Sequence, residues 1–195
     1  DELQLATVVM EPSTGRIIAL SGGKNYIQSQ YNRAIKSKRQ VGSTMKPFLY
    51  YSALENGFTS ASSFISEKTT FSISNSKYSP KNYNDKYANG PLSMGAAIAY
   101  SDNIYAVKTG LLVGSTDLSN LLDSFDIKYI NTPSSFLGSI STSLLKLTSM
   151  YNCLASEGKY YKPSYIESVY KNDGTLIYKN NISFNPILSK NETII

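Results

Sequence analysis

The chain has 195 residues, of which 41% are hydrophobic and 17% are charged, a composition typical of a globular protein with a substantial core. It contains no histidine and a single cysteine, Cys153, which excludes a Ser-His-Asp triad and an internal disulfide and argues against a zinc site. The formal net charge is +5, and its densest basic cluster, Lys36-Ser37-Lys38-Arg39, is more typical of a solvated loop than of a nucleic-acid patch. No apolar run approaches the ~20 residues that span a bilayer, and no signal-peptide pattern is present. We therefore expect no metal, no cofactor and no nucleic-acid partner, with Cys153 as a small core residue.

The chain is predicted to begin with a β-hairpin. Residues 5–11 and 16–21 are rich in β-branched and apolar side chains, and Pro12-Ser13-Thr14-Gly15 between them is typical of a turn.

Residues 44–54 are predicted to form a helix that ends at Glu55-Asn56-Gly57. Ser43 and Lys46 are three residues apart and would lie on one face of it, about one turn apart. A serine hydroxyl becomes a good nucleophile when a base takes its proton, and a partly desolvated lysine can be that base. Ser-x-x-Lys alone is a weak signal, because any helix with a serine cap and a lysine one turn later matches it.

Residues 58–90 show no periodicity and are rich in Ser, Thr, Asn and Tyr, which favours a long surface excursion that builds one wall of a site. Its tyrosines, Tyr83 among them, could stack on a peptide or glycan or simply pack half-buried.

Residues 92–100 are predicted to form a helix of small residues that leads to Ser101-Asp102-Asn103. A further helix follows, and either Ser101 or Asp102 is its expected N-cap. Beyond it the pattern predicts a helix over 117–125 capped by Thr116 or Asp117, a loop over 133–143, a helix over 144–156, and a hairpin of 166–170 and 175–178.

Ser-x-x-Lys followed 58 residues later by Ser-Asp-Asn resembles the transpeptidase domain of bifunctional penicillin-binding proteins, in the serine D,D-peptidase and β-lactamase superfamily. The order of a strand, a Pro-x-x-Gly turn, a strand ending in Gly22-Gly23, and then Arg39-Gln40-Val41-Gly42-Ser43 adds to the resemblance. It implies an α+β fold in which an antiparallel sheet packs with helices. Residues 1–195 would be the N-terminal and central part of that domain.

The resemblance implies a site. Ser43 would be the nucleophile, Lys46 its base, Ser101 a proton relay, and Asn103 the group that orients the lysine and the substrate amide. It also implies that Gly42, Asp102 and Tyr83 contribute to substrate binding. The implied activity is peptidoglycan cross-linking through an acyl-enzyme at the extracytoplasmic face of a bacterial membrane. Stem peptides would be the substrates and β-lactams covalent inhibitors, and an upstream segment would anchor the parent protein.

The family's third motif, Lys-Thr-Gly, lies on a strand facing the serine. Lys108-Thr109-Gly110 has the same letters, but it falls inside a predicted helix five residues after Asn103, and we reject it as that motif. The closing strands and final helix of the family are therefore expected to lie outside this sequence, through truncation or in a second chain. The isolated chain is accordingly expected to be weakly active or inactive.

Two alternatives remain open at this stage. A serine β-lactamase would need an efficient deacylating base, and no glutamate lies in a Glu-x-x-Leu-Asn context. A non-catalytic module that binds β-lactams or peptidoglycan would fit a chain without the third motif.

Overall fold

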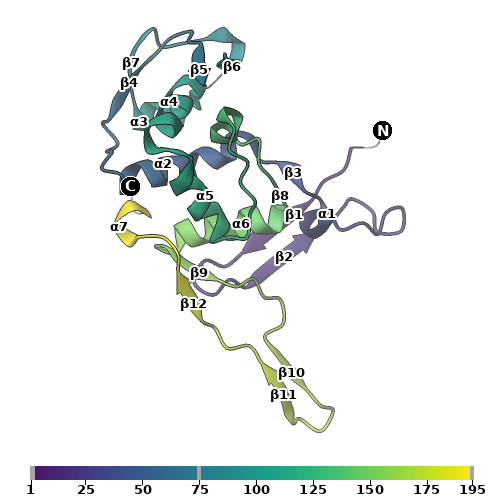
Figure 1. Ribbon diagram of the computed structural model, residues 1–195. Helices are drawn as coiled ribbons and strands as arrows, with labels where there is room; N and C mark the ends of the chain where they lie inside the picture. Colours follow the sequence, from purple (N-terminus) through teal and green to yellow (C-terminus); the bar gives the residue numbers. More distant parts are fainter. Residues whose placement is uncertain (1–2, 74–75, 194–195) are drawn as a thin grey trace. The chain divides into compact units, whose positions relative to one another are not determined.

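The computed structural model describes residues 3–73 and 76–193, and the chain divides into two compact units. Of the described residues, 3–39 and 142–193 form a terminal unit, and Gln40–Ser141 form a central unit. Both contain helices and short antiparallel strands, so the expected α+β class is confirmed (Figure 1). No pattern in the sequence predicted this division into two units.

The terminal unit begins with the predicted hairpin. Strand β1 (Thr7–Met10) pairs with β2 (Ile17–Ser21), and a bulge falls between Val9 and Met10. Helix α6 (Leu144–Ala155) packs against β1 and against the short helix α1 (Arg33–Lys36), as Figure 1 shows. The Ser143 side chain caps α6 by accepting from the Lys146 N–H at 3.2 Å.

The rest of the terminal unit consists of strand pairs and a short helix. Strand β10 (Ser168–Tyr170) pairs with β11 (Leu176–Lys179), as the Asp-Gly turn predicts. Strand β9 (Lys159–Tyr161) pairs with β12 (Phe184–Pro186), and α7 (Lys190–Thr193) follows. The β9–β12 pair was not predicted, because its strands lie more than twenty residues apart and neither shows alternation over more than three residues.

The core of the central unit is built around α2 (Lys46–Glu55), which contacts α4 (Asn103–Val113) and α5 (Ser115–Asp123). Helix α2 is buried on nearly all sides, which is why its sequence lacks an amphipathic pattern. A 3₁₀ turn, η3 (Pro133–Leu137), packs against α4. Short strands β3 (Arg39–Gln40) and β8 (Ser141–Thr142) lie where the chain passes between units. The side chains that fill this core are Met45, Phe48, Leu49, Tyr50, Tyr105, Val107, Leu118, Leu122 and Phe136.

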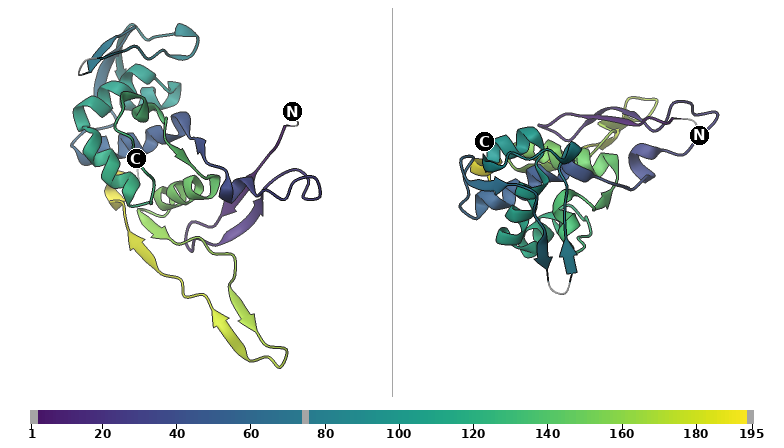
Figure 2. Two further views of the ribbon diagram at one scale, coloured as in Figure 1. Left: turned by 45° about the vertical axis from the view of Figure 1, so that its right-hand side comes forward. Right: turned by 90° about the horizontal axis from the view of Figure 1, so that it is seen from above.

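The prediction of an irregular excursion over 58–90 is corrected. Strand β4 (Ser63–Ser66) pairs with β7 (Gly90–Ser93), and β5 (Phe71–Ile73) pairs with β6 (Ser76–Tyr78) in a hairpin that projects from the helices of the unit (Figure 2). A 3₁₀ turn, η2 (Tyr83–Asp85), lies between β6 and β7. Strand β4 is fixed by tertiary packing, since the Phe64 ring lies 4.9 Å from that of Tyr105 between centroids.

The junction between α3 (Met94–Tyr100) and α4 follows the prediction in outline. Ser101 closes α3 in the left-handed conformation, with φ of 53°, and Asp102 is the N-cap of α4. The third-motif lookalike, Lys108-Thr109-Gly110, is helical, which confirms its rejection. Gly114 ends α4, and the expected side-chain cap of α5 at Thr116 or Asp117 is wrong, since Gly114 itself is the N-cap.

None of the helices in the described residues combines the length and apolar character required to cross a bilayer.

Candidate active site

Lys46 lies at the first residue of α2 and is 3% exposed. Its Nζ lies 2.6 Å from the carbonyl oxygen of Ser101, 2.6 Å from Oδ1 of Asn103 and 3.0 Å from Oγ of Ser101. The structure thus brings together three of the four residues predicted to be catalytic, from two parts of the sequence more than fifty residues apart.

Burial lowers the pKa of Lys46 to about 8, because the surrounding protein replaces the water that would solvate an ammonium. The negative charge of Asp102 acts in the opposite direction and limits the fall. A lysine with this pKa is neutral in about a tenth of molecules at pH 7, compared with roughly three in ten thousand at the ordinary value of 10.5. Lys46 can therefore act as a base near neutral pH.

The three contacts of Lys46 differ in whether the partner can donate a proton. A neutral amine has two N–H donors, and both acceptors at 2.6 Å, the Ser101 carbonyl and the Asn103 amide oxygen, can only accept. The third partner is a hydroxyl, which can donate to the nitrogen. A proton can therefore be exchanged between Lys46 and the Ser101 hydroxyl in this arrangement.

Ser43 lies in the 3₁₀ turn η1 (Gly42–Met45) that leads into α2, and its side chain is exposed. It falls one position before the start of the predicted helix, which begins in the structure as a 3₁₀ turn. Among the described residues, no hydrogen bond joins its hydroxyl to Lys46, so the base–nucleophile pair itself stays a prediction.

Gly42 has φ of 58°, a conformation that glycine adopts without strain, and its N–H donates to the carbonyl of Gly138 at 2.9 Å. A Cβ on Gly138 would collide with the Gly42 carbonyl, so this close approach of two backbones holds the residue before Ser43 in place. Substrate binding by Gly42 stays a prediction.

Asp102 is 4% exposed, and its carboxylate accepts from three donors. Oδ1 accepts from the Tyr105 N–H at 2.7 Å, and Oδ2 accepts from Ser66 Oγ at 2.5 Å and Asn82 Nδ2 at 2.6 Å. These contacts indicate that Asp102 stabilises the conformation of the Ser101-Asp102-Asn103 segment. Direct contact with a substrate, the role predicted for it, stays untested.

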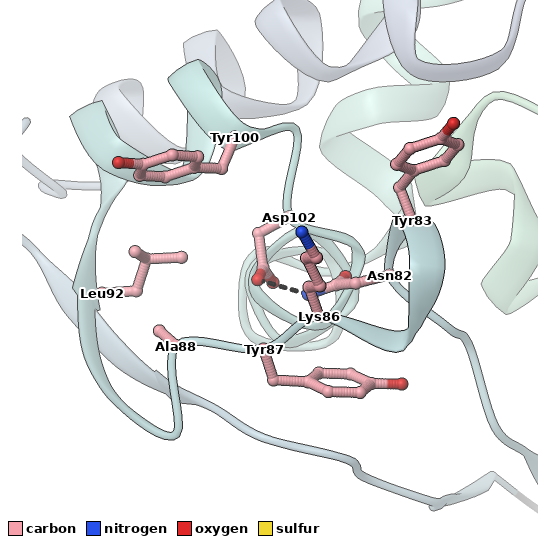
Figure 3. A pocket seen from close by; sticks show the side chains of 8 residues that line it. All are labelled: Asn82, Tyr83, Lys86, Tyr87, Ala88, Leu92, Tyr100 and Asp102. Carbon is pink, nitrogen blue, oxygen red and sulfur yellow. Dashed lines mark hydrogen bonds between the residues drawn. The ribbon is translucent and has the colours of Figure 1, made fainter.

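Tyr83, also predicted to bind substrate, is 87% exposed and lines a pocket of about 490 Å³. Figure 3 shows Asp102 and Asn82 joined by a hydrogen bond, with the rings of Tyr83, Tyr87 and Tyr100 spread around them. Neither Ser43 nor Lys46 is among the lining residues of this pocket. Its mostly aromatic and aliphatic lining is typical of small-ligand sites.

Sequence reasoning missed Asn82, Lys81 and Ser66, which complete the network. Asn103 donates from its backbone N–H to Asn82 Oδ1 at 2.7 Å and from Nδ2 to the Lys81 carbonyl at 2.6 Å. The only available signal was their position in the segment before the second motif, which gives no hint of which side chain turns inward.

The site contains the parts of a serine–lysine acyl-transfer centre. They are a serine three residues before a buried lysine, and a second serine and an asparagine within hydrogen-bonding distance of that lysine. Comparison with known proteins agrees with this class. Residues 5–193 match the family described as penicillin binding protein transpeptidase domain, and the chain belongs to that family.

Relatives of known sequence include penicillin-binding protein 2D of Bacillus subtilis, 39% identical over 183 residues that cover 92% of this chain and 26% of that protein. Penicillin-binding protein 1A of Rickettsia bellii is 33% identical over 184 residues, 91% of this chain and 23% of that protein. The chain thus spans about a quarter of the length of these curated relatives.

Solved structures give the same family. Penicillin-binding protein 1A from Haemophilus influenzae is similar with a TM-score of 0.87 and 30% identity, over 93% of this chain and 28% of that chain. Penicillin-binding protein A from M. tuberculosis, solved as an imipenem acyl-enzyme complex, has a TM-score of 0.84 and 20% identity, over 97% of this chain and 55% of that chain. The latter shows the shared fold.

Proposed function

We propose that this chain carries the acyl-transfer centre of a peptidoglycan D,D-transpeptidase, with Ser43 as nucleophile and Lys46 as its base. The observation that supports this most strongly is the buried Lys46 nitrogen, with its lowered pKa, held by both the serine and the asparagine of the second motif.

In the first half-reaction, neutral Lys46 takes the proton of the Ser43 hydroxyl as its oxygen attacks the carbonyl between the two terminal D-alanines of a stem peptide. The backbone N–H of Ser43, at the start of a helical segment, would stabilise the oxyanion that develops. Terminal D-alanine then leaves with a proton relayed from Lys46 through Ser101, whose hydroxyl lies 3.0 Å from Nζ.

In the second half-reaction, an amine of another stem peptide gives a proton to neutral Lys46 and attacks the carbonyl of the acyl-enzyme. The ester bond to Ser43 breaks, the Ser43 oxygen takes the proton back from Lys46, and the new amide bond is the cross-link. A β-lactam would acylate the same serine. The M. tuberculosis penicillin-binding protein A has been solved as a penicillin G acyl-enzyme complex, and we extend that chemistry to Ser43 as part of the proposal. Because the substrate lies outside the cytoplasmic membrane, the site would work on the extracytoplasmic face.

Intact-mass spectrometry after incubation with benzylpenicillin tests the proposal. Because the chain lacks the third motif, we expect the adduct to form slowly, with a final mass increase of one penicillin after prolonged incubation and no increase in Ser43→Ala. Ser72→Ala, which removes an exposed serine on β5, should retain the adduct. A folded chain that gains no mass, or an adduct that persists in Ser43→Ala, would refute Ser43 as the nucleophile of this chain.

A further inference from the structure

The side-chain amide of Asn103 is held from two sides. Its Oδ1 accepts from Lys46 Nζ at 2.6 Å, while its Nδ2 donates to the backbone carbonyl of Lys81 at 2.6 Å. A backbone carbonyl can only accept, so its contact decides which end of the amide is nitrogen. The amide oxygen is thereby turned toward the lysine.

The backbone that supplies this carbonyl is anchored by the next residue, Asn82. Its Oδ1 accepts from the Asn103 N–H at 2.7 Å, and its Nδ2 donates to Asp102 Oδ2 at 2.6 Å (Figure 3). The carboxylate of Asp102 only accepts, so it fixes the orientation of the Asn82 amide in turn. One side chain therefore ties the backbone at residues 81–82 to two successive residues of the second motif.

These contacts end at Asp102, whose position is fixed by further hydrogen bonds. Asp102 is buried at the N-cap of α4, where the Tyr105 N–H and the Ser66 hydroxyl hold the carboxylate in addition to Asn82. A fully satisfied buried network specifies a single arrangement of its members.

We propose that Asn82 is a positioning residue for Lys46: it holds the Lys81 carbonyl against the Asn103 amide and so keeps Asn103 Oδ1 on the lysine nitrogen. The catalytic meaning of this role rests on the proposed function, whereas the geometric role can be measured on the unreacted chain.

The test is a pH titration of Lys46 by NMR in protein labelled with ¹³C at the lysine ε carbon, with the Lys46 signal assigned by its loss in Lys46→Met. A hydrogen bond to the charged form of a group favours that form, so an ammonium deprived of the Asn103 oxygen should release its proton more easily. We expect Asn103→Ala and Asn82→Ala each to lower the pKa of Lys46 by about one unit.

The double variant separates positioning from a general effect on structure. If Asn82 acts through Asn103, the pKa of Lys46 in Asn82→Ala/Asn103→Ala should equal that in Asn103→Ala alone. Lys81→Ala is the matched control, because it removes an exposed ammonium and keeps the carbonyl, and it should leave the pKa of Lys46 within about 0.3 unit of the parent value. Asn82→Ser serves the same purpose if Asn82→Ala does not fold, and a fall in the same direction is expected.

The positioning role is overturned if neither variant at Asn82 moves the pKa of Lys46, or if the shifts of the two single alanine variants add in the double variant. Penicillin labelling of the same proteins is a separate readout. A wild-type chain that fails to label while the titration cycle behaves as described would refute the proposed function and leave the positioning role standing.

Discussion

Gly110 is a helical residue at which a single added methyl group should disturb the packing of the central unit. It lies in the buried face of α4, against the ring of Phe136 in η3. A Cβ at this position would lie 2.3 Å from the nearest ring carbon, far inside ordinary contact distance. Gly110→Ala therefore forces either α4 or η3 to move.

The magnitude follows from two opposing effects. Alanine favours a helix over glycine by about 1 kcal/mol, whereas overpacking a core costs typically about 1–3 kcal/mol and occasionally more. Because Phe136 is itself buried and its ring carbons are the overlapping atoms, we expect the steric effect to dominate, with a net loss of about 1–2 kcal/mol. Gly95→Ala is the matched control: Gly95 is in α3, its added Cβ would meet nothing closer than 3.9 Å, and about 0.5–1 kcal/mol should be gained.

Urea unfolding followed by circular dichroism measures both free energies of unfolding. We expect opposite signs for the two variants, with Gly110→Ala less stable and Gly95→Ala more stable than the parent chain. If Gly110→Ala were as stable as the parent chain or more stable, the contact between Gly110 and Phe136 would not be tight. Packing would then not explain why position 110 is a glycine.

Three further outcomes are expected. Lys46 keeps its proton up to about pH 10.5 in the unfolded chain but only up to about pH 8 in the folded chain. The free energy of unfolding of the parent, relative to that of Lys46→Met, should therefore increase by up to about 3 kcal/mol between pH 8 and pH 10.5. A difference that does not change with pH in urea titrations would contradict the lowered pKa. Asp102→Asn places an amide N–H₂ opposite groups that are themselves donors, so it should lower the free energy of unfolding by about 1–3 kcal/mol. Asp85 is exposed, so Asp85→Asn should change that free energy by no more than about 0.5 kcal/mol. Equal effects of the two variants in thermal unfolding would argue against the buried network. Burial raises the pKa of the Cys153 thiol to about 12, so iodoacetamide at pH 8 should alkylate Cys153 only when the chain is unfolded in urea, as followed by the mass of the chain. Rapid alkylation of the folded chain would place Cys153 outside the core.

Local signals decided which parts of the fold could be predicted. The β1–β2 hairpin was found because Pro12-Ser13-Thr14-Gly15 is typical of a turn, and the helix predicted over 144–156 is α6. The β9–β12 and β4–β7 pairs were missed because their strands are short and their partners lie far apart in the sequence. Pairing of this kind is set by tertiary contact, which a local pattern does not record.

The site shows the same limit. The resemblance to the family named Lys46, Ser101 and Asn103, and the structure places them within hydrogen-bonding distance. Asn82 could not be distinguished by sequence from Asn84, two positions later in the same polar segment, yet Asn82 joins the buried network and Asn84 is exposed. A backbone carbonyl such as that of Lys81 has no sequence signature at all.

The central claim is that a neutral Lys46 activates Ser43. The most direct measurement is the initial rate of benzylpenicillin adduct formation from pH 6 to pH 10, followed by intact mass, with Lys46→Arg in parallel because arginine stays protonated throughout this range. We expect the rate to rise with pH, with a midpoint near pH 8, and then to level off, and we expect no adduct in Lys46→Arg. A rate that is independent of pH, or an adduct that forms equally fast in Lys46→Arg, would contradict the central claim.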